Sequence, residues 1–365
     1  MTTNKKRAYN FNAGPAAIPL SVLEKAQSEL TDFQGTGMSI MELSHRSNDY
    51  KAVHNAAIER LTKLYNIPEN YEILFLQGGA STQFATIPMN FLTPDTEANY
   101  VMTGSWSEKA IKEANLFGKT SITASSESDQ YRYIPTVSHT DIDKNAAYVH
   151  ITTNNTIYGT QWQTFPELND VPLIADMSSD IMSKPINIEQ FDIIYAGAQK
   201  NLGPSGITVV IIKKDLLEKG NTNIPTMFQY KTHAKANSLY NTPPTFGIYM
   251  LGEVLKWIEE QGGLEAVAKN NEEKAALLYN VIDESDGFYV GHAEKESRSL
   301  MNITFRLQDE SLEVQFLDEA KEAGFVGLNG HRSVGGCRAS TYNAVPYETC
   351  KALSEFMISF MKRNK

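Results

Sequence analysis

Between about residues 20 and 260, short apolar runs alternate with amphipathic stretches, and this alternation restricts the fold more than any other feature. The apolar runs predict strands at 72–76, 99–103, 147–152, 173–175, 193–195 and 207–212. Several runs are apolar at consecutive positions, which is typical of strands covered by helices on both faces. The sequence therefore predicts an α/β fold with a mostly parallel, helix-covered sheet.

Two helix starts are predicted from short capping patterns. Ser21 with Glu24, and Ser105 with Glu108, match the Ser-x-x-Glu capping box, in which the serine accepts a hydrogen bond from the first helical turn. Both pairs lie at the beginning of an amphipathic stretch. We therefore expect helices to begin at these two serines.

The alternation ends at Gly262-Gly263. After these glycines the order becomes helix, strand, helix, and a last helix from about Tyr347. We expect a large α/β domain over residues 17–262 and a smaller α+β domain over residues 263–365. The N-terminal segment 1–16 is expected to join the smaller domain.

The charge and the cysteines exclude several classes of protein. The net charge is −10 and the pI is about 5.3, and the only basic block is Lys5-Lys6-Arg7, so no nucleic-acid partner is expected. Cys337 and Cys350 form no CxxC pair and no zinc-type spacing with histidine, so no metal is expected. No apolar run is long enough to cross a bilayer, which predicts a cytoplasmic protein without a membrane partner.

The segment Tyr195-Ala-Gly-Ala-Gln-Lys-Asn-Leu-Gly-Pro-Ser-Gly206 places one lysine, Lys200, between an apolar run and a glycine-rich turn. A lysine near the end of a buried strand is partly desolvated, which favours its neutral, nucleophilic amine. Such amines form Schiff bases with carbonyl compounds and with pyridoxal phosphate. The alternative is an ordinary lysine with its charged end in water.

Asp176 follows another short apolar strand, 24 positions before Lys200. Ligands of open α/β sheets bind outside the carboxyl ends of the strands, so both side chains can reach one pocket. A carboxylate there can pair with a protonated pyridine nitrogen, as in pyridoxal phosphate enzymes. The alternative is an aspartate that caps the next helix.

A candidate phosphate site follows the first predicted strand, in Leu76-Gln-Gly-Gly-Ala-Ser-Thr-Gln-Phe84. Two glycines followed by a helix start bring free N–H groups and a favourable helix dipole to an anion. The segment matches neither the dinucleotide fingerprint nor the P-loop, so nucleotide binding has no support. Trp106 and Thr156 also follow predicted strands, where the indole can stack on a flat ring; a core tryptophan and a turn threonine are the alternatives.

Two segments share a His-Arg-Ser tripeptide: Ser44-His-Arg-Ser47 and Gly330-His-Arg-Ser-Val-Gly-Gly-Cys-Arg338. Arginine binds carboxylate and phosphate groups through two parallel hydrogen bonds, and the glycines and serines around it favour anion-binding loops. The candidates for binding an anionic substrate are therefore His45, Arg46, His331, Arg332 and Arg338. Lone histidines in loops are more often simply exposed.

Taken together, these motifs resemble those of the pyridoxal phosphate aminotransferases of fold type I, in class V, and specifically those of the phosphoserine aminotransferase family. The resemblance runs nearly end to end and depends on these segments in this order: 11–15 (Phe-Asn-Ala-Gly-Pro), 43–47, 78–81, 104–106, 155–157, 176–179, 199–206, 240–243 and 330–338.

The resemblance implies pyridoxal 5'-phosphate as the cofactor and a role for each cofactor contact. It implies Lys200 as the Schiff-base lysine, Asp176 at the pyridine nitrogen and Trp106 stacked on the ring. Thr156 is implied near the ring hydroxyl. The residues implied at the cofactor phosphate are Ala80, Ser81 and Gln199, with Asn241 and Thr242 contributed by the neighbouring subunit of a homodimer.

The resemblance also implies the reaction. The substrates would be L-glutamate and 3-phosphohydroxypyruvate, with Arg338 at the α-carboxylate, and the product O-phospho-L-serine would serve serine biosynthesis. His45, Arg46, His331 and Arg332 would bind the substrate phosphate or the distal carboxylate. Many relatives carry an arginine where this chain has Ser81, so the two His-Arg loops must contribute more to phosphate binding. Whether a phosphorylated hydroxythreonine of vitamin B6 synthesis is also a substrate stays open.

Four other functions are alternatives to this one, and each places a different requirement on the sequence. An aminotransferase acting on glyoxylate keeps the cofactor and changes the acceptor. A cysteine desulfurase needs a mobile catalytic cysteine, and Cys337 and Cys350 lie in segments expected to be packed. A nicotinamide-dependent dehydrogenase needs a glycine fingerprint that follows no predicted strand. A non-catalytic dimeric scaffold would not need the lysine, the acid and the arginines together.

Overall fold

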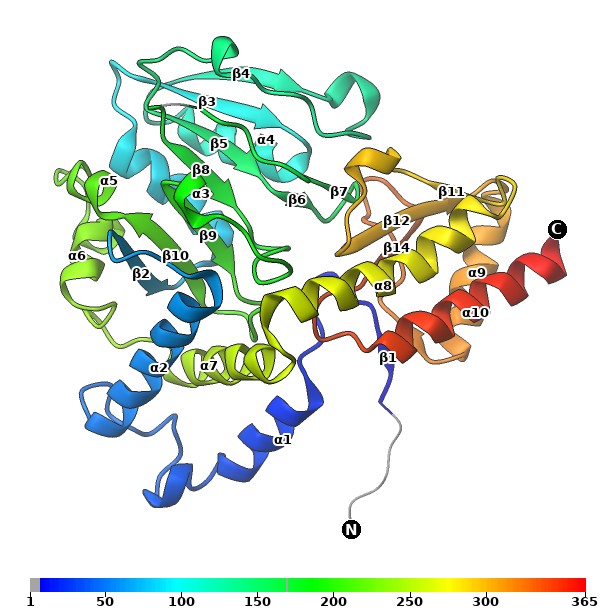
Figure 1. The fold of residues 1–365 in the computed structure, drawn as a ribbon, viewed down its shortest axis with the longest axis horizontal. Coiled ribbons are helices and arrows are strands. Elements are labelled where there is room, and N and C mark those ends of the chain that lie inside the picture. Colours follow the sequence, from blue (N-terminus) through cyan, green and yellow to red (C-terminus); the bar gives the residue numbers. More distant parts are fainter. Residues whose placement is uncertain (1–6, 169) are drawn as a thin grey trace.

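The structure, a computed structural model, describes residues 7–168 and 170–365 and has a seven-stranded sheet at its centre (Figure 1). In spatial order the strands are β2 (Tyr71–Leu76), β10 (Thr208–Lys213), β9 (Ile193–Gly197), β8 (Leu173–Asp176), β5 (Tyr148–Thr152), β3 (Glu97–Met102) and β4 (Lys119–Ser125). From β9 to β4 all neighbours are parallel, whereas β10 is antiparallel to both of its neighbours. The predicted α/β fold is confirmed.

Helices cover both faces of this sheet. The helices that precede residue 262 are α1 (Leu20–Glu29), α2 (Asn48–Tyr65), α3 (Gly79–Phe91), α4 (Ser105–Ala114), α5 (Lys214–Glu218), α6 (Tyr230–Lys235) and α7 (Thr245–Glu260). Alternate strand residues enter two separate cores: Ile194 packs in the cluster that contains α2 and α7, and Ile193 in the cluster that contains α3 and α4. Coverage on both faces explains why the strands are apolar at consecutive positions.

The sequence missed strand β4; it predicted the starts of α1 and α4 to within one residue, but neither predicted capping box forms. Strand β4 lies at the sheet edge and none of its residues is buried, so it lacks the apolar run that revealed the other strands. Helix α1 follows Pro19 without a side-chain cap. At α4 the capping hydroxyl belongs to Ser107, whose Oγ accepts hydrogen bonds from the backbone N–H groups of Thr103 and Gly104 at 3.1 and 3.2 Å. Ser105 is already inside the helix.

A second core lies beyond residue 262. Its elements are α8 (Gly263–Asp283), β11 (Tyr289–Gly291), β12 (Asn302–Leu307), α9 (Ser311–Glu322), β13 (Phe325–Val326), β14 (Cys337–Ser340) and α10 (Tyr347–Asn364). Strands β11, β12 and β14 form an antiparallel sheet. Helix α8 belongs to both cores, because Leu264 packs with the large sheet while Leu278 packs with the small one.

The N-terminal segment lies against this second core. Strand β1 (Tyr9–Asn10) pairs in parallel with β13, and the buried Phe11 packs in the small cluster. On this basis we propose a large unit over residues 17–262 and a small unit over residues 263–365 that share α8 and include the N-terminal segment. Residues 1–6 of the predicted segment 1–16, and with them Lys5 and Lys6, lie outside the described residues.

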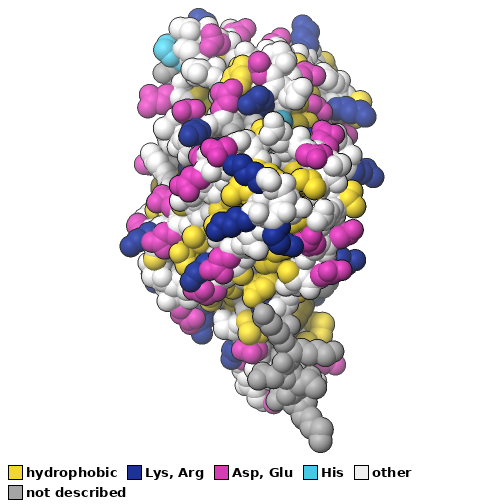
Figure 2. All heavy atoms as spheres, turned by 90° about the vertical axis from the view of Figure 1, so that its right-hand side faces the viewer, with side chains coloured by type: hydrophobic (Ala, Val, Ile, Leu, Met, Phe, Trp, Pro, Cys, Tyr) yellow, Lys and Arg dark blue, Asp and Glu magenta, His cyan; other side chains and the backbone are white. Residues whose placement is uncertain are grey.

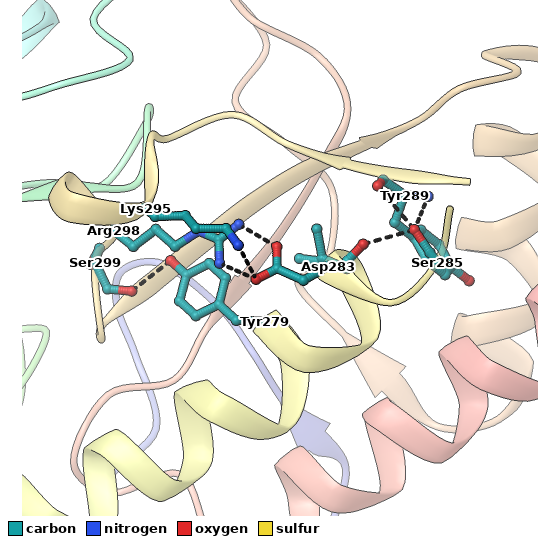
Figure 3. A network of polar contacts seen from close by, with 8 residues as sticks. Tyr279, Asp283, Ser285, Tyr289, Lys295, Arg298 and Ser299 are labelled. Carbon is teal, nitrogen blue, oxygen red and sulfur yellow. Dashed lines mark hydrogen bonds and ion pairs between the residues drawn. The ribbon is translucent and has the colours of Figure 1, made fainter. Parts of the chain in front are cut away.

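The two units meet at a hairpin formed by β6 (Asn154–Asn155) and β7 (Thr160–Gln161). On the small-unit side, Asp283 accepts two hydrogen bonds from the Arg298 guanidinium at 2.6 and 2.8 Å, and that guanidinium lies 4.5 Å from the centroid of the Tyr279 ring (Figure 3). The next residue, Ser299, donates its backbone N–H to the carbonyl of Gly159 in the hairpin at 2.9 Å. This contact fixes a loop that carries Thr156.

The surface near α9 and α10 mixes charges of both signs (Figure 2). One ion pair joins these helices, Arg363 with Glu319 at 2.8 Å, and another joins the C-terminal Lys365 to Asp286, beyond the end of α8, at 2.9 Å. Within the described part of the chain, no helix is long and apolar enough to cross a membrane. The remaining short elements are 3₁₀ turns: η1 (Phe33–Gly35), η2 (Glu127–Asp129), η3 (His139–Asp141), η4 (Ile188–Gln190), η5 (Thr226–Phe228) and η6 (Lys295–Ser297).

Candidate active site

A cavity of about 580 Å³ opens at the carboxyl ends of strands β8, β5 and β3 and is closed on one side by the start of α3. Cavities at this edge of an open α/β sheet are its usual ligand sites. Predicted site residues make up much of its wall: Ala80, Ser81, Trp106, Thr156, Asp176, Gln199, Lys200, His331 and Arg338. They come from both units of the fold.

Lys200 lies in the turn that follows β9 and is half-buried in the cavity wall. Burial lowers the pKa of its amine to about 8, since the charged form loses contact with water. The carboxylate of Asp176 acts in the opposite direction, and the positive charge of Arg338 adds to the lowering. The amine is therefore far more often neutral near neutral pH than an exposed lysine would be.

Asp176 is the last residue of β8 and is 5% exposed. Its Oδ1 accepts hydrogen bonds from the backbone N–H and the hydroxyl of Ser178, at 2.9 and 2.6 Å. Burial raises the pKa of Asp176, whereas the Ser178 hydrogen bonds and the charge of Lys200 oppose that rise. No described residue donates to Oδ2, so one carboxylate oxygen is available to a ligand in the cavity.

The start of α3 forms the candidate phosphate site. Gly78 precedes the helix with φ 94°, and a Cβ at this position would lie 2.0 Å from Oγ1 of Thr82, so only glycine fits. The N–H groups of Gly79, Ala80 and Ser81 have no carbonyl four residues earlier within the helix to bond to. These groups and the helix dipole suit a phosphate.

Thr156 connects a ring-stacking residue to an anion-binding residue. Its hydroxyl accepts a hydrogen bond from Nε1 of Trp106 at 3.1 Å, and its carbonyl accepts one from Nη1 of Arg338 at 2.7 Å. The centroid of the Trp106 ring lies 5.6 Å from Nζ of Lys200. Gly104 permits this arrangement, because a Cβ there would lie 2.2 Å from the side chain of Asn155.

The loop over residues 330–336 brings positive charge to the mouth of the cavity. His331 and Arg338 line the cavity, while Arg332 between them is exposed. Burial lowers the pKa of His331, and the charges of Arg338, Arg332 and Lys109 lower it further. Nε of Arg338 is buried and has no hydrogen-bond partner among the described residues. The geometry and charge of this wall suit an anion.

Five predicted site residues do not line this cavity: His45, Arg46, Arg332, Asn241 and Thr242. His45 and Arg46 lie in a turn just before α2. Asn241 lines a different cavity of about 250 Å³, beside Phe75 and Tyr230. A single chain therefore does not bring these residues to the lysine.

Sequence reasoning overlooked several wall residues. The N-terminal residues Ala13, Gly14 and Pro15 line the cavity, held there by a hydrogen bond from the backbone N–H of Ala16 to the carbonyl of Gln199 at 2.9 Å. Polar wall residues from the strand ends were also missed: Thr152, Asn154, Ser178, Ser179 and Ser205. Ser178, Ser179 and Ser205 lie in segments that carry the family resemblance, 176–179 and 199–206, but neither those segments nor a position after a strand indicated a role for these side chains.

These residues fit pyridoxal phosphate. The open oxygen of Asp176 suits a pyridine nitrogen, the Trp106 indole suits a flat ring, and the N–H groups at the start of α3 suit a phosphate. Among residues 7–168 and 170–365, no group of three or more His, Cys, Asp or Glu side chains is arranged to hold a metal ion. The site has the parts of a lysine-based pyridoxal phosphate enzyme.

Comparison with known proteins agrees with this class. The family model described as aminotransferase class-V matches residues 8–353. The chain therefore belongs to the class-V aminotransferases, and pyridoxal 5'-phosphate is its cofactor.

Within that class its relatives are phosphoserine aminotransferases. A phosphoserine aminotransferase of Lysinibacillus sphaericus strain C3-41 is 67% identical over 360 residues, which cover 99% of both chains. One of Bacillus subtilis strain 168 is 61% identical over 360 residues, covering 99% of this chain and all of the relative. The chain thus belongs to the phosphoserine aminotransferase family.

Solved structures agree with this assignment. The phosphoserine aminotransferase of Bacillus circulans subsp. alkalophilus has a TM-score of 0.97 at 59% identity and covers 99% of this chain and 100% of its own. A pyridoxal phosphate-bound relative from Trichomonas vaginalis has a TM-score of 0.90 at 40% identity, covering 96% and 100%. A ureidoglycine–glyoxylate aminotransferase of Bacillus subtilis is 14% identical with a TM-score of 0.77, which shows the shared fold alone.

Proposed function

We propose that this enzyme transfers the amino group of L-glutamate to 3-phosphohydroxypyruvate, giving 2-oxoglutarate and O-phospho-L-serine for serine biosynthesis. The observation that carries the proposal is the convergence of Lys200, Asp176, Trp106 and Arg338 on one cavity. The names and identities of the full-length relatives support the choice of substrates.

Within the cavity, each cofactor contact has a proposed residue. Asp176 would hold the pyridine nitrogen with its open oxygen, Trp106 would stack on the ring, and Thr156 would lie near the ring hydroxyl. Ala80, Ser81 and Gln199 would bind the phosphate. When bound, pyridoxal phosphate supplies a carbonyl carbon that amines attack and a ring that takes up electrons released at the substrate Cα.

Lys200 would act as nucleophile and as general acid and base in turn. With a pKa of about 8, its amine is neutral often enough to bond a carbonyl carbon, and once displaced it can take the Cα proton. The same amine would then return the proton to another atom. Asp176, being buried and held by Ser178, keeps its charge in a fixed place during both transfers.

The anionic groups of the substrates would be bound by the part of the cavity wall that the small unit contributes. Arg338 would bind the α-carboxylate through the N–H groups on the Nε edge of its guanidinium, since Nε lacks any other partner among the described residues. His331 and Arg332 would bind the phosphate or the distal carboxylate. Because Ser81 supplies no positive charge, these side chains carry more of the phosphate binding.

The enzyme is proposed to work as a homodimer in the cytoplasm. His45 and Arg46, for the substrate phosphate, and Asn241 and Thr242, for the cofactor phosphate, lie away from the cavity of their own chain. Their contribution from a neighbouring subunit would complete each site. Use of the phosphorylated hydroxythreonine of vitamin B6 synthesis as a second substrate is part of the same proposal.

The substrate assignment is tested by comparing 3-phosphohydroxypyruvate with unphosphorylated hydroxypyruvate and with glyoxylate, with glutamate as donor. We expect kcat/KM for the phosphorylated acceptor to be about 100-fold or more above the other two, because buried charge pairs discriminate strongly. Equal values would contradict the phosphate assignment and favour a more general aminotransferase.

The shared site is tested by mixing two inactive variants, Lys200→Ala and Arg46→Ala, after subunit exchange. If Arg46 serves the neighbouring subunit, each hybrid dimer has one intact site, and activity should return to about a quarter of wild type. If Arg46 serves its own chain, no hybrid has an intact site. Absence of recovery in exchanged hybrids would therefore contradict the shared site.

A further inference from the structure

Lys274, in the middle of helix α8, is a buried cation that the proposed reaction does not use. Its side chain is 0% exposed and has no ion-pair partner among the described residues. Instead, Nζ donates hydrogen bonds to the backbone carbonyls of Thr341, Tyr342 and Val345, at 3.0, 2.8 and 3.1 Å. A lysine ammonium has three donors, so this arrangement satisfies it completely.

The loop that Lys274 holds follows strand β14, which carries Arg338. Residues 341–345 of this loop have no strand partner to take up these three carbonyls, and buried carbonyls without a donor are costly. Lys274 therefore replaces the hydrogen bonds that regular structure would have supplied. One side chain thus binds three carbonyls of the loop at once.

The same loop contacts the residue next to the catalytic lysine. The backbone N–H of Asn343 donates to Oδ1 of Asn201 at 3.0 Å, and Nδ2 of Asn201 donates to the carbonyl of Ile181 at 3.1 Å. The Asn343 side chain donates to the carbonyl of Met182 at 2.8 Å. Asn201 thus ties the Lys200 turn both to this loop and to the segment that follows Asp176.

Two further contacts hold the loop to the cavity wall and to α8. The hydroxyl of Tyr342 donates to the carbonyl of Ala13 at 2.8 Å, and Ala13 lines the cavity. Nδ2 of Asn271, one turn before Lys274, donates to Oδ1 of Asn343 at 2.9 Å and to the carbonyl of Ser183 at 3.0 Å. The loop is thereby bonded to α8, to the N-terminal segment and to the large unit.

We propose that Lys274 is a positioning residue for transamination: by fixing loop 341–345, it sets the distance between the Lys200 amine and the Arg338 guanidinium through the Asn343–Asn201 contact. This inference rests on the proposed function of Lys200 and Arg338. If Lys274 only stabilised the small unit, the loop that it holds would not need to contact Asn201, as it does through Asn343. That contact extends its effect to the catalytic turn.

The test compares Lys274→Met with Lys269→Met, an exposed lysine on the same helix, both as holoenzymes. Methionine keeps the apolar stem and removes all three donors. We expect KM for glutamate to rise about 10- to 100-fold, with a smaller fall in kcat, because misplacement of a carboxylate-binding group by an ångström has effects of this size. The Lys269→Met variant should match wild type.

A spectroscopic measurement separates positioning from stability alone. In Lys274→Met the pH midpoint of the Schiff-base absorbance should shift, because the position of Lys200 relative to charged neighbours changes. A variant with a lower unfolding temperature but unchanged KM and unchanged midpoint would overturn the proposal. Failure of the wild-type holoenzyme to transfer the amino group of glutamate to 3-phosphohydroxypyruvate would instead contradict the proposed function.

If Lys274→Met does not fold, a second variant provides an independent test of the same contact. Asn201→Ala removes the Oδ1 that accepts the hydrogen bond from the Asn343 backbone N–H and leaves Lys274 with its three carbonyls. It should raise KM for glutamate and shift the absorbance midpoint in the same direction. Where both single variants fold, their effects should be less than additive in the double variant, because they act through one loop. Full additivity, or an Asn201→Ala enzyme identical to wild type, would overturn the proposal.

Discussion

Lys200 and Lys274 are two lysines whose amines have a similarly lowered pKa, but only the Lys200 amine is proposed to take part in the reaction. Burial lowers the pKa of each amine to about 8. Lys200 lines a cavity, faces a carboxylate and has no fixed hydrogen-bond acceptor among the described residues. Lys274 is fully packed, and three carbonyl oxygens accept all of its donors.

The comparison shows that a lowered pKa does not by itself mark a reactive lysine. Reactivity also needs open space at the nitrogen and freedom to give up the proton, and only Lys200 has both. The three carbonyls accept hydrogen bonds from all of the Lys274 donors, and the packing around its amine leaves no room for a carbonyl carbon. Geometry around the amine, rather than the pKa, separates the proposed catalytic residue from the proposed positioning residue.

The largest expected effect comes from removing one lysine at a time. Lys200→Ala should lower kcat by at least about 1000-fold, because the nucleophile and the proton carrier are both lost. It should also remove the Schiff-base absorbance of the holoenzyme. Lys274→Met should keep that absorbance. Full activity in Lys200→Ala, measured with glutamate and 3-phosphohydroxypyruvate, would contradict the proposal that Lys200, and not Lys274, is the nucleophile and proton carrier.

The next largest effect is expected from Asp176→Asn, which should change the pKa of Lys200 and leave that of Lys274 unchanged. In Asp176→Asn the carboxylate that raises the pKa of Lys200 is lost, so that pKa should fall below about 8 while the pKa of Lys274 stays where it is. Activity should fall about 100- to 1000-fold. The pH dependence of acylation at Lys200 in the cofactor-free protein, followed by mass spectrometry, measures the shift. A rise in that pKa would contradict the electrostatic account.

How much of this could be read from the sequence differs between the two lysines. Lys200 follows an apolar strand and precedes glycines, a local pattern that predicted both its burial and its chemistry. Lys274 follows Asn271-Glu-Glu273, which reads as the exposed face of a helix. Its burial depends on a loop about 70 residues away, which no local pattern shows. Local signals therefore pointed to the proposed catalytic residue, and they gave no sign of the proposed positioning residue.

The same limit applies elsewhere in the molecule. The apolar strands and the Gly78-Gly79 turn were predicted because their sequence carries the signal, whereas the polar edge strand β4 and the cap at Ser107 depend on neighbours in space. His45 and Asn241 stay predictions for the site, because their own chain does not bring them to the cavity.

A third effect concerns stability as a function of pH. The pKa of Lys274 is about 8 in the folded chain and about 10.5 when exposed, so the unfolded chain binds more protons between these values. Folding carries a penalty from Lys274 below pH 8 that is relieved as the pH rises toward 10.5. The stability of wild type relative to Lys274→Met should therefore increase by about 3 kcal/mol over this range.

Denaturant titrations of the two cofactor-free proteins at pH 7.5, 9 and 10 would measure the difference, with Lys269→Met as the exposed control. A difference between wild type and Lys274→Met that decreases as the pH rises would show that the three carbonyls hold the proton above the normal lysine pKa. That result would mean that the pKa of Lys274 is raised by folding, the opposite of the shift inferred for Lys200.

The smallest expected effect tests the surroundings of Lys200 alone. Thr156→Val removes the hydroxyl that holds the Trp106 indole and keeps the backbone carbonyl that holds Arg338. Loss of one hydrogen bond of about 1 kcal/mol should weaken cofactor binding about fivefold, with KM for glutamate unchanged. Fluorescence of Trp106 on cofactor titration gives the affinity. An increase in KM larger than the loss of cofactor affinity would show that the two contacts of Thr156 are not independent.

The pairing of β1 with β13 also has a consequence for how the enzyme becomes active during synthesis. The first described residues reach their partner strand only after roughly 300 more residues have been made, on the order of tens of seconds at ribosomal rates. Until then the β1–β13 pairing cannot help the Ala16–Gln199 hydrogen bond to hold Ala13 and its neighbours beside Lys200. A nascent chain can form its large sheet early, but its catalytic cleft acquires its last wall only when translation is nearly finished.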